Sequence, residues 1–392
     1  MNDLLRKLPI GIQTFEKLRK GDYLYVDKTE LVWKIAYTST PYFLSRPRRF
    51  GKSLLLSTFE AYFEGKKELF EGLAIEKLET KWEKHPVLHL DLNAEKYDSP
   101  ERLYDILSRQ LTLWEIQYGK GIDENTLSGR FSGVIRRAYE QTGSSVVVLV
   151  DEYDKPLLQA LGNDVLLDEY RKTLKAFYGV LKSADRYLRF VFTGVTKFSQ
   201  VSVFSDLNQL QDITLWPDYG TLCGITLQEL LDTFQPEIKI LAANNSISYD
   251  DAVQRMTRLY DGYHFCINSV GIFNPFSVLN VLKSKVFDNY WFQTGTPTFL
   301  VEMLQETEYD LRTLLDGIEA PSSMFSEYRV DSNNPIPLIY QSGYLTIKDF
   351  DREFGNYLLQ FPNDEVRYGF INFLVPFYTG VRNSDQGFYI GK

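Results

Sequence analysis

The 392-residue sequence contains few cysteines and few histidines. Its two cysteines, Cys223 and Cys266, are too few for a disulfide framework, which fits a reducing compartment. Its three histidines, His85, His89 and His264, do not stand at metal-ligand spacing with cysteines or carboxylates. We therefore expect neither a disulfide-stabilised fold nor a structural zinc site.

Long apolar runs are also missing. No stretch approaches the roughly 20 residues that a membrane-spanning helix needs, and the N-terminal MNDLLRKLPIGI lacks the apolar core of a signal peptide. Hydrophobic residues make up 44% and charged residues 24% of the chain, which is typical of globular proteins. We expect a cytoplasmic protein of two or three domains that does not enter a membrane.

Positive charge is concentrated at one end of an acidic chain. The net charge is −9, which argues against a protein that coats nucleic acid. Residues 1–60 nevertheless hold 11 Lys/Arg against 6 Asp/Glu, whereas the remaining chain holds 32 against 46. An anionic ligand is therefore expected at the N-terminal part of the chain.

Apolar segments alternate with helical patterns through the first half of the chain. Short apolar or β-branched runs predict strands at 41–45, at 87–93, at the start of 145–154, and at 186–197. Apolar residues at helical spacing predict helices between them, at 99–117, 129–142 and 165–184. This alternation predicts an α/β fold, a parallel sheet with helices on both faces. The strand at 41–45 runs directly into RPRRFGKS, whose GKS is typical of a phosphate loop, so the sheet is expected to be that of a P-loop NTPase.

The pattern changes after about residue 222. Helices dominate up to a predicted β-hairpin at 344–361, and a helix is expected after it. We predict a P-loop ATPase-like domain with an N-terminal lead-in at 1–222, a helical, winged-helix-like lid module at 223–378, and a tail at 379–392.

A candidate phosphate-binding loop follows the first strand. The window Arg46–Ser53 matches G-x-x-x-x-G-K-[ST] except at its first position, where Arg46 replaces glycine. In such a loop Gly51 permits close approach of the backbone, Lys52 bridges the β- and γ-phosphates, and Ser53 binds Mg²⁺. A basic surface turn is the plain alternative. The predicted nucleotide-binding residues are Arg46, Pro47, Arg48, Arg49, Phe50, Gly51, Lys52, Ser53 and Leu54.

Two carboxylates close the β-branched strand VVVLV. Asp151 is expected to hold the Mg²⁺ shell and Glu152 to polarise the attacking water, so that Glu152 and Lys52 are the predicted catalytic residues. Asp154 follows two residues later and could support either role. The plain alternative is that these carboxylates cap the next helix. A cap explains Asp154 better than it explains Asp151 and Glu152, because charges at the end of a buried strand are costly without a positive partner. ATP and Mg²⁺ are thus the predicted cofactors.

Further polar residues are candidates for a γ-phosphate sensor and for an arginine finger. Thr193 and Thr196 follow the strand RFVF and are candidates for a residue that senses the γ-phosphate, or are ordinary threonines of a strand and turn. No context distinguishes the candidates for an arginine finger, which are Arg136, Arg137, Arg186 and Arg189.

Several segments together resemble the bacterial AAA-ATPase-like family over residues 8–378. They are LPIGIQTFEKLRKGDYLYVDKT, FLSRPRRFGKSLLLSTF, VVVLVDEYDKPL, FTGVTKFSQVSVFSDLN, YDGYHF, NPFSVLN, TGTPTFLVEML, QSGYLTI and FPNDEVR. The family's own loop reads R-P-R-R-F-G-K-S, so Arg46 agrees with it. The resemblance implies an ATPase with a winged-helix lid. Many members continue into a PD-(D/E)XK nuclease domain, for which we find no D…ExK constellation in the tail, and we expect none here.

Three functions fit these observations. The first is a Mg-ATP-binding ATPase whose nucleotide state moves the C-terminal helical module. The second is a nucleotide-binding switch that barely hydrolyses ATP, and the third is a nucleic-acid-associated module. Glu152 favours the first over the second, and the acidic total disfavours the third. Besides the nucleotide, candidate partners are a nucleic acid, a protein client or a second copy of the chain.

Overall fold

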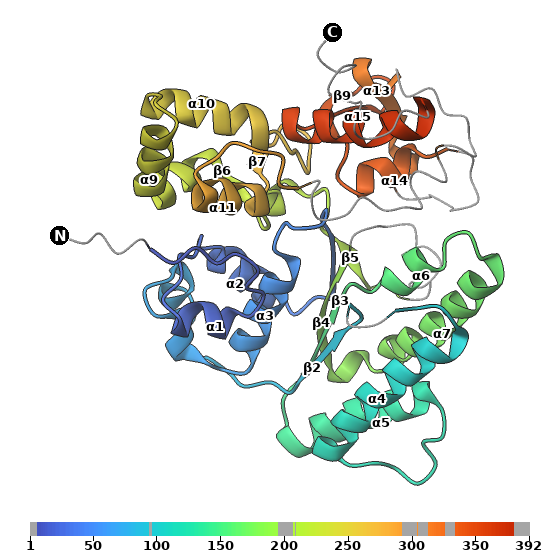
Figure 1. The fold of residues 1–392 in the computed structure, drawn as a ribbon. Coiled ribbons are helices and arrows are strands. Elements are labelled where there is room, and N and C mark those ends of the chain that lie inside the picture. The colour runs from blue at the N-terminus through green and yellow to red at the C-terminus, as the bar shows by residue number, and fades with distance from the viewer. Residues whose placement is uncertain are drawn as a thin grey trace. The chain divides into compact units, whose positions relative to one another are not determined.

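The structure, a computed structural model, describes residues 6–93, 96–194, 207, 209–291, 304, 313–325 and 334–379. The chain forms two compact units (Figure 1). The sheet unit comprises Ile12–Arg46 and Lys52–Thr214, and the hairpin unit comprises Met1–Gly11, Pro47–Gly51 and Leu215–Lys392. The domain boundaries expected from the sequence stay predictions.

The sheet unit is built on a parallel sheet, as predicted. Its strands are β1 (Tyr42–Ser45), β2 (Val87–Asp91), β3 (Val146–Asp151), β4 (Leu188–Gly194) and β5 (Gln211–Asp212). They lie in the order β2-β3-β4-β1-β5, and every neighbouring pair is parallel. All residues of β1 and β3 are buried, as expected for central strands covered on both faces. The carboxyl ends of β1 and β3 therefore point to the same edge.

Helices cover both faces of this sheet (Figure 1). One face carries α1 (Phe15–Lys20), α2 (Thr29–Tyr37) and α3 (Lys52–Phe63), with the short 3₁₀ helices η1 (Lys67–Phe70) and η2 (Ala74–Lys77). The other carries α4 (Pro100–Tyr118), α5 (Leu127–Thr142), α6 (Lys155–Gln159) and α7 (Asp164–Ser183), and η3 (Asp185–Tyr187) precedes β4. The mixed α/β architecture predicted for this half is confirmed.

Local chemistry explains where α5 begins and ends. The side chain of Thr126 accepts a hydrogen bond from the Gly129 amide at the start of α5, and Gly143 ends that helix in the left-handed region at φ 69°. The buried Arg130 of α5 donates to Glu115 of α4 over 2.7 Å. A buried, bidentate ion pair of this kind fixes the packing of the two helices.

The hairpin unit is mostly helical. Its helices include α9 (Leu227–Asn244), α10 (Tyr249–Tyr260), α11 (Pro275–Ser284), α13 (Thr313–Asp316), α14 (Ile336–Gln341) and α15 (Asp364–Thr379), with η4 (Pro217–Tyr219) and η6 (Ser322–Phe325). Two short antiparallel sheets accompany them. One pairs β6 (Ile225–Thr226) with β7 (Ile272–Phe273), and the other has the order β8-β10-β9, formed by β8 (Ile318–Pro321), β9 (Thr346–Asp351) and β10 (Asn356–Gln360).

The predicted hairpin is present as the antiparallel pair β9 and β10, and α15 follows it as expected. Its description as a winged helix stays a prediction. Within the described parts of the chain, no helix has both the length and the apolar character needed to cross a bilayer.

Candidate nucleotide-binding site

The predicted phosphate loop connects the end of β1 at Ser45 to the start of α3 at Lys52. Two of its residues, Arg49 and Gly51, adopt left-handed backbone conformations, with φ of 70° and 89°. A Cβ atom at Gly51 would meet no other atom within 4 Å, so backbone conformation rather than crowding requires glycine there. The loop thus reverses sharply just before the first turn of α3, where unpaired amides favour an anion.

Arg46, at the position where the general motif has glycine, is directed into the sheet unit. Its side chain is 1% exposed, and its Nη1 donates to the carbonyl oxygens of Ser45 at 2.8 Å and Thr214 at 2.9 Å. The hydroxyl of Thr214 also accepts a hydrogen bond from the Ser45 amide at 3.0 Å. Arg46 therefore connects the end of β1 to the segment after β5 by hydrogen bonds, so this arginine has a structural role within the sheet unit. Its predicted contact with a nucleotide stays a prediction.

Lys52 is the first residue of α3 and is buried. Its Nζ lies 3.2 Å from the carbonyl oxygen of Arg46 and 3.7 Å from Oε1 of Glu152. Ser53 and Leu54 follow on α3 and are partly exposed. An ammonium at the positive end of a helix is unfavourable by itself, so a nearby carboxylate or phosphate stabilises it.

The acidic pair lies at the carboxyl end of β3. Asp151 is the last residue of that strand and is 4% exposed. Glu152 follows at φ 52°, a left-handed conformation that is strained for a residue with a side chain. The neighbouring Tyr153 is fully buried, and its ring packs edge-on against Phe43 of β1 with centroids 5.5 Å apart. This packing holds the strained turn, and the turn directs Glu152 to Lys52.

The structure describes two of the three remaining candidates, Asp154 and Thr193. Asp154 is the N-cap residue of α6 and is fully buried, but its side chain makes no capping hydrogen bond. Thr193 lies in β4, where it pairs with Leu44 of β1, and β4 runs between β1 and β3 as a sensor strand requires. Thr196 lies outside the described residues. The roles of these residues in binding stay predictions.

Among the candidate arginine fingers, Arg137 and Arg189 donate hydrogen bonds within the sheet unit. Arg137 forms a bidentate pair with Glu124, one bond of which measures 2.9 Å. Arg189 donates to the carbonyl oxygen of Ala36. These contacts explain both arginines through the fold of the sheet unit.

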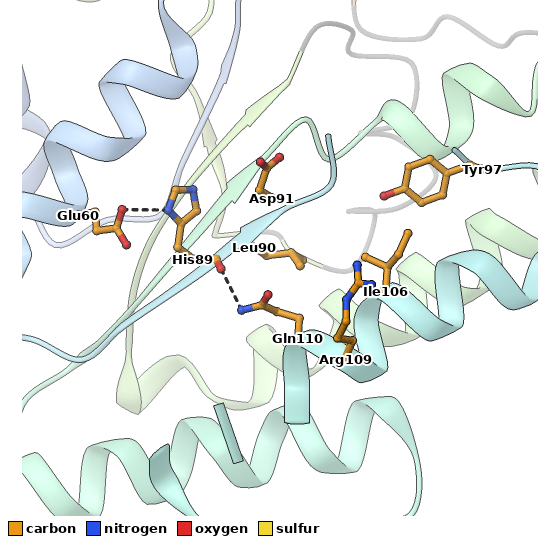
Figure 2. A pocket seen from close by; sticks show the side chains of 8 residues that line it. All are labelled: Glu60, His89, Leu90, Asp91, Tyr97, Ile106, Arg109 and Gln110. Atoms are coloured by element: carbon orange, nitrogen blue, oxygen red, sulfur yellow. Dashed lines mark hydrogen bonds and ion pairs between the residues drawn. The ribbon is translucent and has the colours of Figure 1, made fainter. Parts of the chain in front are cut away.

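A cavity of about 420 Å³ opens beside β2 (Figure 2). Its lining residues come from α3, from β2 and the segment after it, and from α4: Glu60, His89, Leu90, Asp91, Tyr97, Ile106, Arg109 and Gln110. Asp91 stands at the end of β2, directly beside Asp151 in the parallel register. Asp91, which lines the cavity, therefore lies beside the acidic end of β3.

His89 is a titratable group of this cavity for which the sequence predicted no role, apart from excluding it as a zinc ligand. Its Nδ1 lies 3.1 Å from Oε2 of Glu60, and the two side chains point toward one another (Figure 2). Burial by itself lowers the pKa of His89, but the hydrogen bond to Glu60 and the charges of Glu60, Asp151 and Asp91 outweigh it and raise the pKa. The only signal in the sequence was the position of His89 on a strand that ends in Asp91.

Mg²⁺ fits the side chains at this edge. The ion prefers oxygen ligands, and it is commonly held by one or two carboxylates together with waters and substrate phosphates. Asp151 offers the carboxylate and Ser53 the hydroxyl. Within the described residues no three His, Cys, Asp or Glu side chains form a metal cluster of their own. The side chains thus suit an ion that arrives with a nucleotide, and Ser53 and Asp151 are the residues that would hold it.

The sheet order, the glycine-lysine-serine loop after β1 and the acidic end of β3 together define a P-loop nucleotide-binding protein. The profile of the family described as Predicted AAA-ATPase matches residues 9–204. The chain belongs to this family. It is also similar to an uncharacterized protein in the vnfD 5' region of Azotobacter chroococcum mcd 1, with 38% identity over 369 residues that cover 92% of this chain and 68% of that protein.

Proposed function

We propose that the protein binds Mg-ATP and hydrolyses it. The observation that carries the proposal is the pairing of Lys52 with Glu152, at 3.7 Å between ammonium and carboxylate, at the edge of the sheet where β1 and β3 end. A buried lysine at a helix start and a carboxylate in a strained turn are each unfavourable alone. Their combination is what a phosphoryl-transfer site requires, namely a cation for the phosphates and a base for water.

Each side chain then has one role. Lys52 binds the β- and γ-phosphates, and the backbone amides of the loop 46–54 surround them. Ser53 and Asp151 would hold Mg²⁺, and the ion would supply positive charge beside the phosphates. Glu152 orients and polarises the attacking water, and Thr193 at the end of the intervening strand senses the terminal phosphate.

The nucleotide state is further proposed to move the C-terminal module of residues 223–378, with its winged-helix-like hairpin. The support is the path of the chain, because Pro47–Gly51 group with the hairpin unit while Arg46 and Lys52 on either side belong to the sheet unit. A change in the loop on phosphate binding therefore passes between the two units through the peptide bonds that flank Pro47–Gly51. A nucleotide-binding switch with little hydrolysis is the alternative.

One sample of purified protein tests both properties. Thermal melts with and without millimolar Mg-ATP report binding, and a ligand at 100 times its dissociation constant adds about 2.7 kcal/mol to stability. ATP turnover in the same sample distinguishes the enzyme from the switch. A melt that does not change with Mg-ATP contradicts nucleotide binding, and a shifted melt with background turnover favours the switch.

A further inference from the structure

The tip of the phosphate loop, Pro47–Phe50, is held by side chains from the C-terminal half of the chain, within the hairpin unit. Phe50 is 1% exposed. Its ring packs edge-to-face against Tyr263, with centroids 4.8 Å apart, and against Phe265, at 5.2 Å. Phosphate loops bind anions with their backbone and need no buried aromatic for that purpose. The contacts of Phe50 therefore require a second explanation.

Pro47 fits against a glycine. Gly343 has φ of 91°, and a Cβ atom at that position would lie 2.6 Å from the Cβ of Pro47. Any side chain at Gly343 would thus collide with the buried Pro47 and push the loop tip away. The glycine is explained both by its left-handed backbone and by the close approach of the loop.

The two arginines of the tip are held through their main chain or their charge. The indole Nε1 of Trp291 donates a long hydrogen bond, 3.4 Å, to the carbonyl oxygen of Arg48. The guanidinium of Arg49 lies 4.8 Å from the centroid of the Phe276 ring, within cation–π range. Every residue from Pro47 to Phe50 therefore has a partner in the same unit.

A buried carboxylate fixes Trp291 in turn. Glu365 is fully buried, and its two oxygens accept hydrogen bonds from the Trp291 amide at 2.9 Å and from the Ser277 hydroxyl at 2.7 Å. Two hydrogen bonds to one fully buried side chain hold that side chain in a single position. Glu365 thus restrains the indole that contacts the loop.

Apart from Trp291, these residues come from four segments that the ATPase site itself leaves without a role. Tyr263 and Phe265 belong to YDGYHF, Phe276 to NPFSVLN, Gly343 to QSGYLTI and Glu365 to FPNDEVR. We call the set Tyr263, Phe265, Phe276, Trp291 and Gly343 the loop socket. The first three segments contact Pro47–Phe50 directly, whereas FPNDEVR reaches the loop through the hydrogen bond of Glu365 to Trp291.

We propose that the loop socket positions the main chain of the phosphate loop, with Phe50 as the anchoring side chain, so that the hairpin unit sets the affinity for nucleotide. The inference rests on the proposed function, because it names what controls that same site. A loop that binds phosphate through its amides loses affinity when they are displaced by a fraction of an ångström to an ångström. Phe50, Trp291 and Glu365 are accordingly positioning residues rather than catalytic ones.

The test compares two variants of equal chemistry. Phe50→Leu removes the anchor. Phe325→Leu is the control, since Phe325 is 4% exposed in the same unit and packs against Tyr340 and Tyr357 rather than against the loop. Two quantities are measured on each full-length protein, namely amide hydrogen exchange of the peptide that covers residues 46–53, and the dissociation constant for Mg-ATP.

Phe50→Leu is expected to speed exchange in this peptide and to weaken Mg-ATP binding by about tenfold or more, whereas Phe325→Leu changes both by less than about twofold. Equal exchange and equal affinity in the two variants overturn the inference. If the wild-type protein binds no Mg-ATP, the proposed function fails, while the exchange measurement still decides whether the socket holds the loop.

A second variant covers the case in which Phe50→Leu does not fold. Phe276 is only half-buried, so Phe276→Leu removes the ring beneath Arg49 with little loss of packing. It is expected to change exchange and affinity in the same direction as Phe50→Leu, by a smaller factor. Wild-type exchange and affinity in Phe276→Leu, in a protein that melts as the wild type does, contradict the inference.

Discussion

The ammonium of Lys52 lies 3.7 Å from a carboxylate oxygen of Glu152, which connects the start of α3 to the turn after β3. The distance is longer than that of a charge-assisted hydrogen bond, and the Lys52 side chain is 4% exposed against 19% for Glu152. A phosphate bound to Lys52 would compete with Glu152 for the same ammonium. Nucleotide binding would thus release the carboxylate that is proposed to polarise water.

Replacement of Lys52 by alanine separates binding from folding. Lys52→Ala is expected to abolish Mg-ATP binding, because the phosphates lose their only proposed side-chain cation on α3. The melt without nucleotide is expected to shift little, because the change also removes an unfavourable cation from a helix start and because Glu152, which is 19% exposed, stays in contact with water. Calorimetric titration and thermal melts measure the two effects. A large loss of stability with binding intact would show that Lys52 is structural.

Much of the sheet unit could be predicted from local sequence. The patterns at 99–117 and 165–184 predicted α4 and α7 to within one residue, and the β-branched run that begins 145–154 predicted β3, because buried parallel strands and amphipathic helices have distinct periodicities. The two-residue strand β5 was missed, since a segment that short carries no periodicity.

The candidate site was predictable only in part. The loop and the acidic pair follow local motifs, but the burial of Arg46 and Phe50 depends on partners about 170 or more residues away. The Glu60–His89 pair likewise joins α3 to β2. Contacts between distant segments leave no periodic signal in a single sequence, so arginines in a loop look like phosphate ligands whether or not they serve the fold.

The Glu60–His89 pair has a measurable dependence on pH. The pKa of His89 is raised, so its stabilising charge is fully present below about pH 6.5 and is lost as the pH rises through the raised pKa. Glu60→Gln removes the partner and leaves the opposing effect of burial. The pKa of His89 is therefore expected to fall, and the variant should lose more stability at pH 5.5 than at pH 9.

Histidine NMR titration resolves this, because the chain has only three histidines. Glu68→Gln, which alters an exposed glutamate of the same unit, is the control. A His89 pKa that is the same in wild type and Glu60→Gln contradicts the electrostatic role of Glu60. So does a loss of stability that is equal at both pH values.

Glu365 is expected to destabilise the protein when it ionises. Burial is the main cause that raises its pKa from 4.5 to about 7. The folded state thus holds a proton that the unfolded state releases, so wild-type stability falls as the pH rises from 4.5 to 7. Glu365→Gln keeps the shape: its amide oxygen can accept from the Trp291 amide, and its amide nitrogen can donate to the Ser277 hydroxyl oxygen. Relative to wild type it is expected to gain stability over that range, by at most roughly 3 kcal/mol.

Melts of Glu365→Gln and of wild type between pH 4.5 and pH 8 measure this gain. Glu353→Gln, which changes an exposed glutamate in the turn between β9 and β10, is the matched control and should follow the wild type at every pH. A difference between Glu365→Gln and wild type that stays constant over the range would show that Glu365 does not titrate there.

The central claim is that Glu152 activates water while Asp151 holds the metal, and one comparison tests it most directly. The Mg-ATP dissociation constant and the single-turnover hydrolysis rate are measured for wild type, Glu152→Gln and Asp151→Asn. Glu152→Gln keeps size and hydrogen bonding, so it should bind Mg-ATP as the wild type does and lose hydrolysis by at least ~10²-fold. Asp151→Asn should instead weaken the Mg²⁺ dependence of binding. Robust wild-type hydrolysis that persists in Glu152→Gln would contradict the assignment, and Asp154, two residues further along the chain, would be the next carboxylate to test.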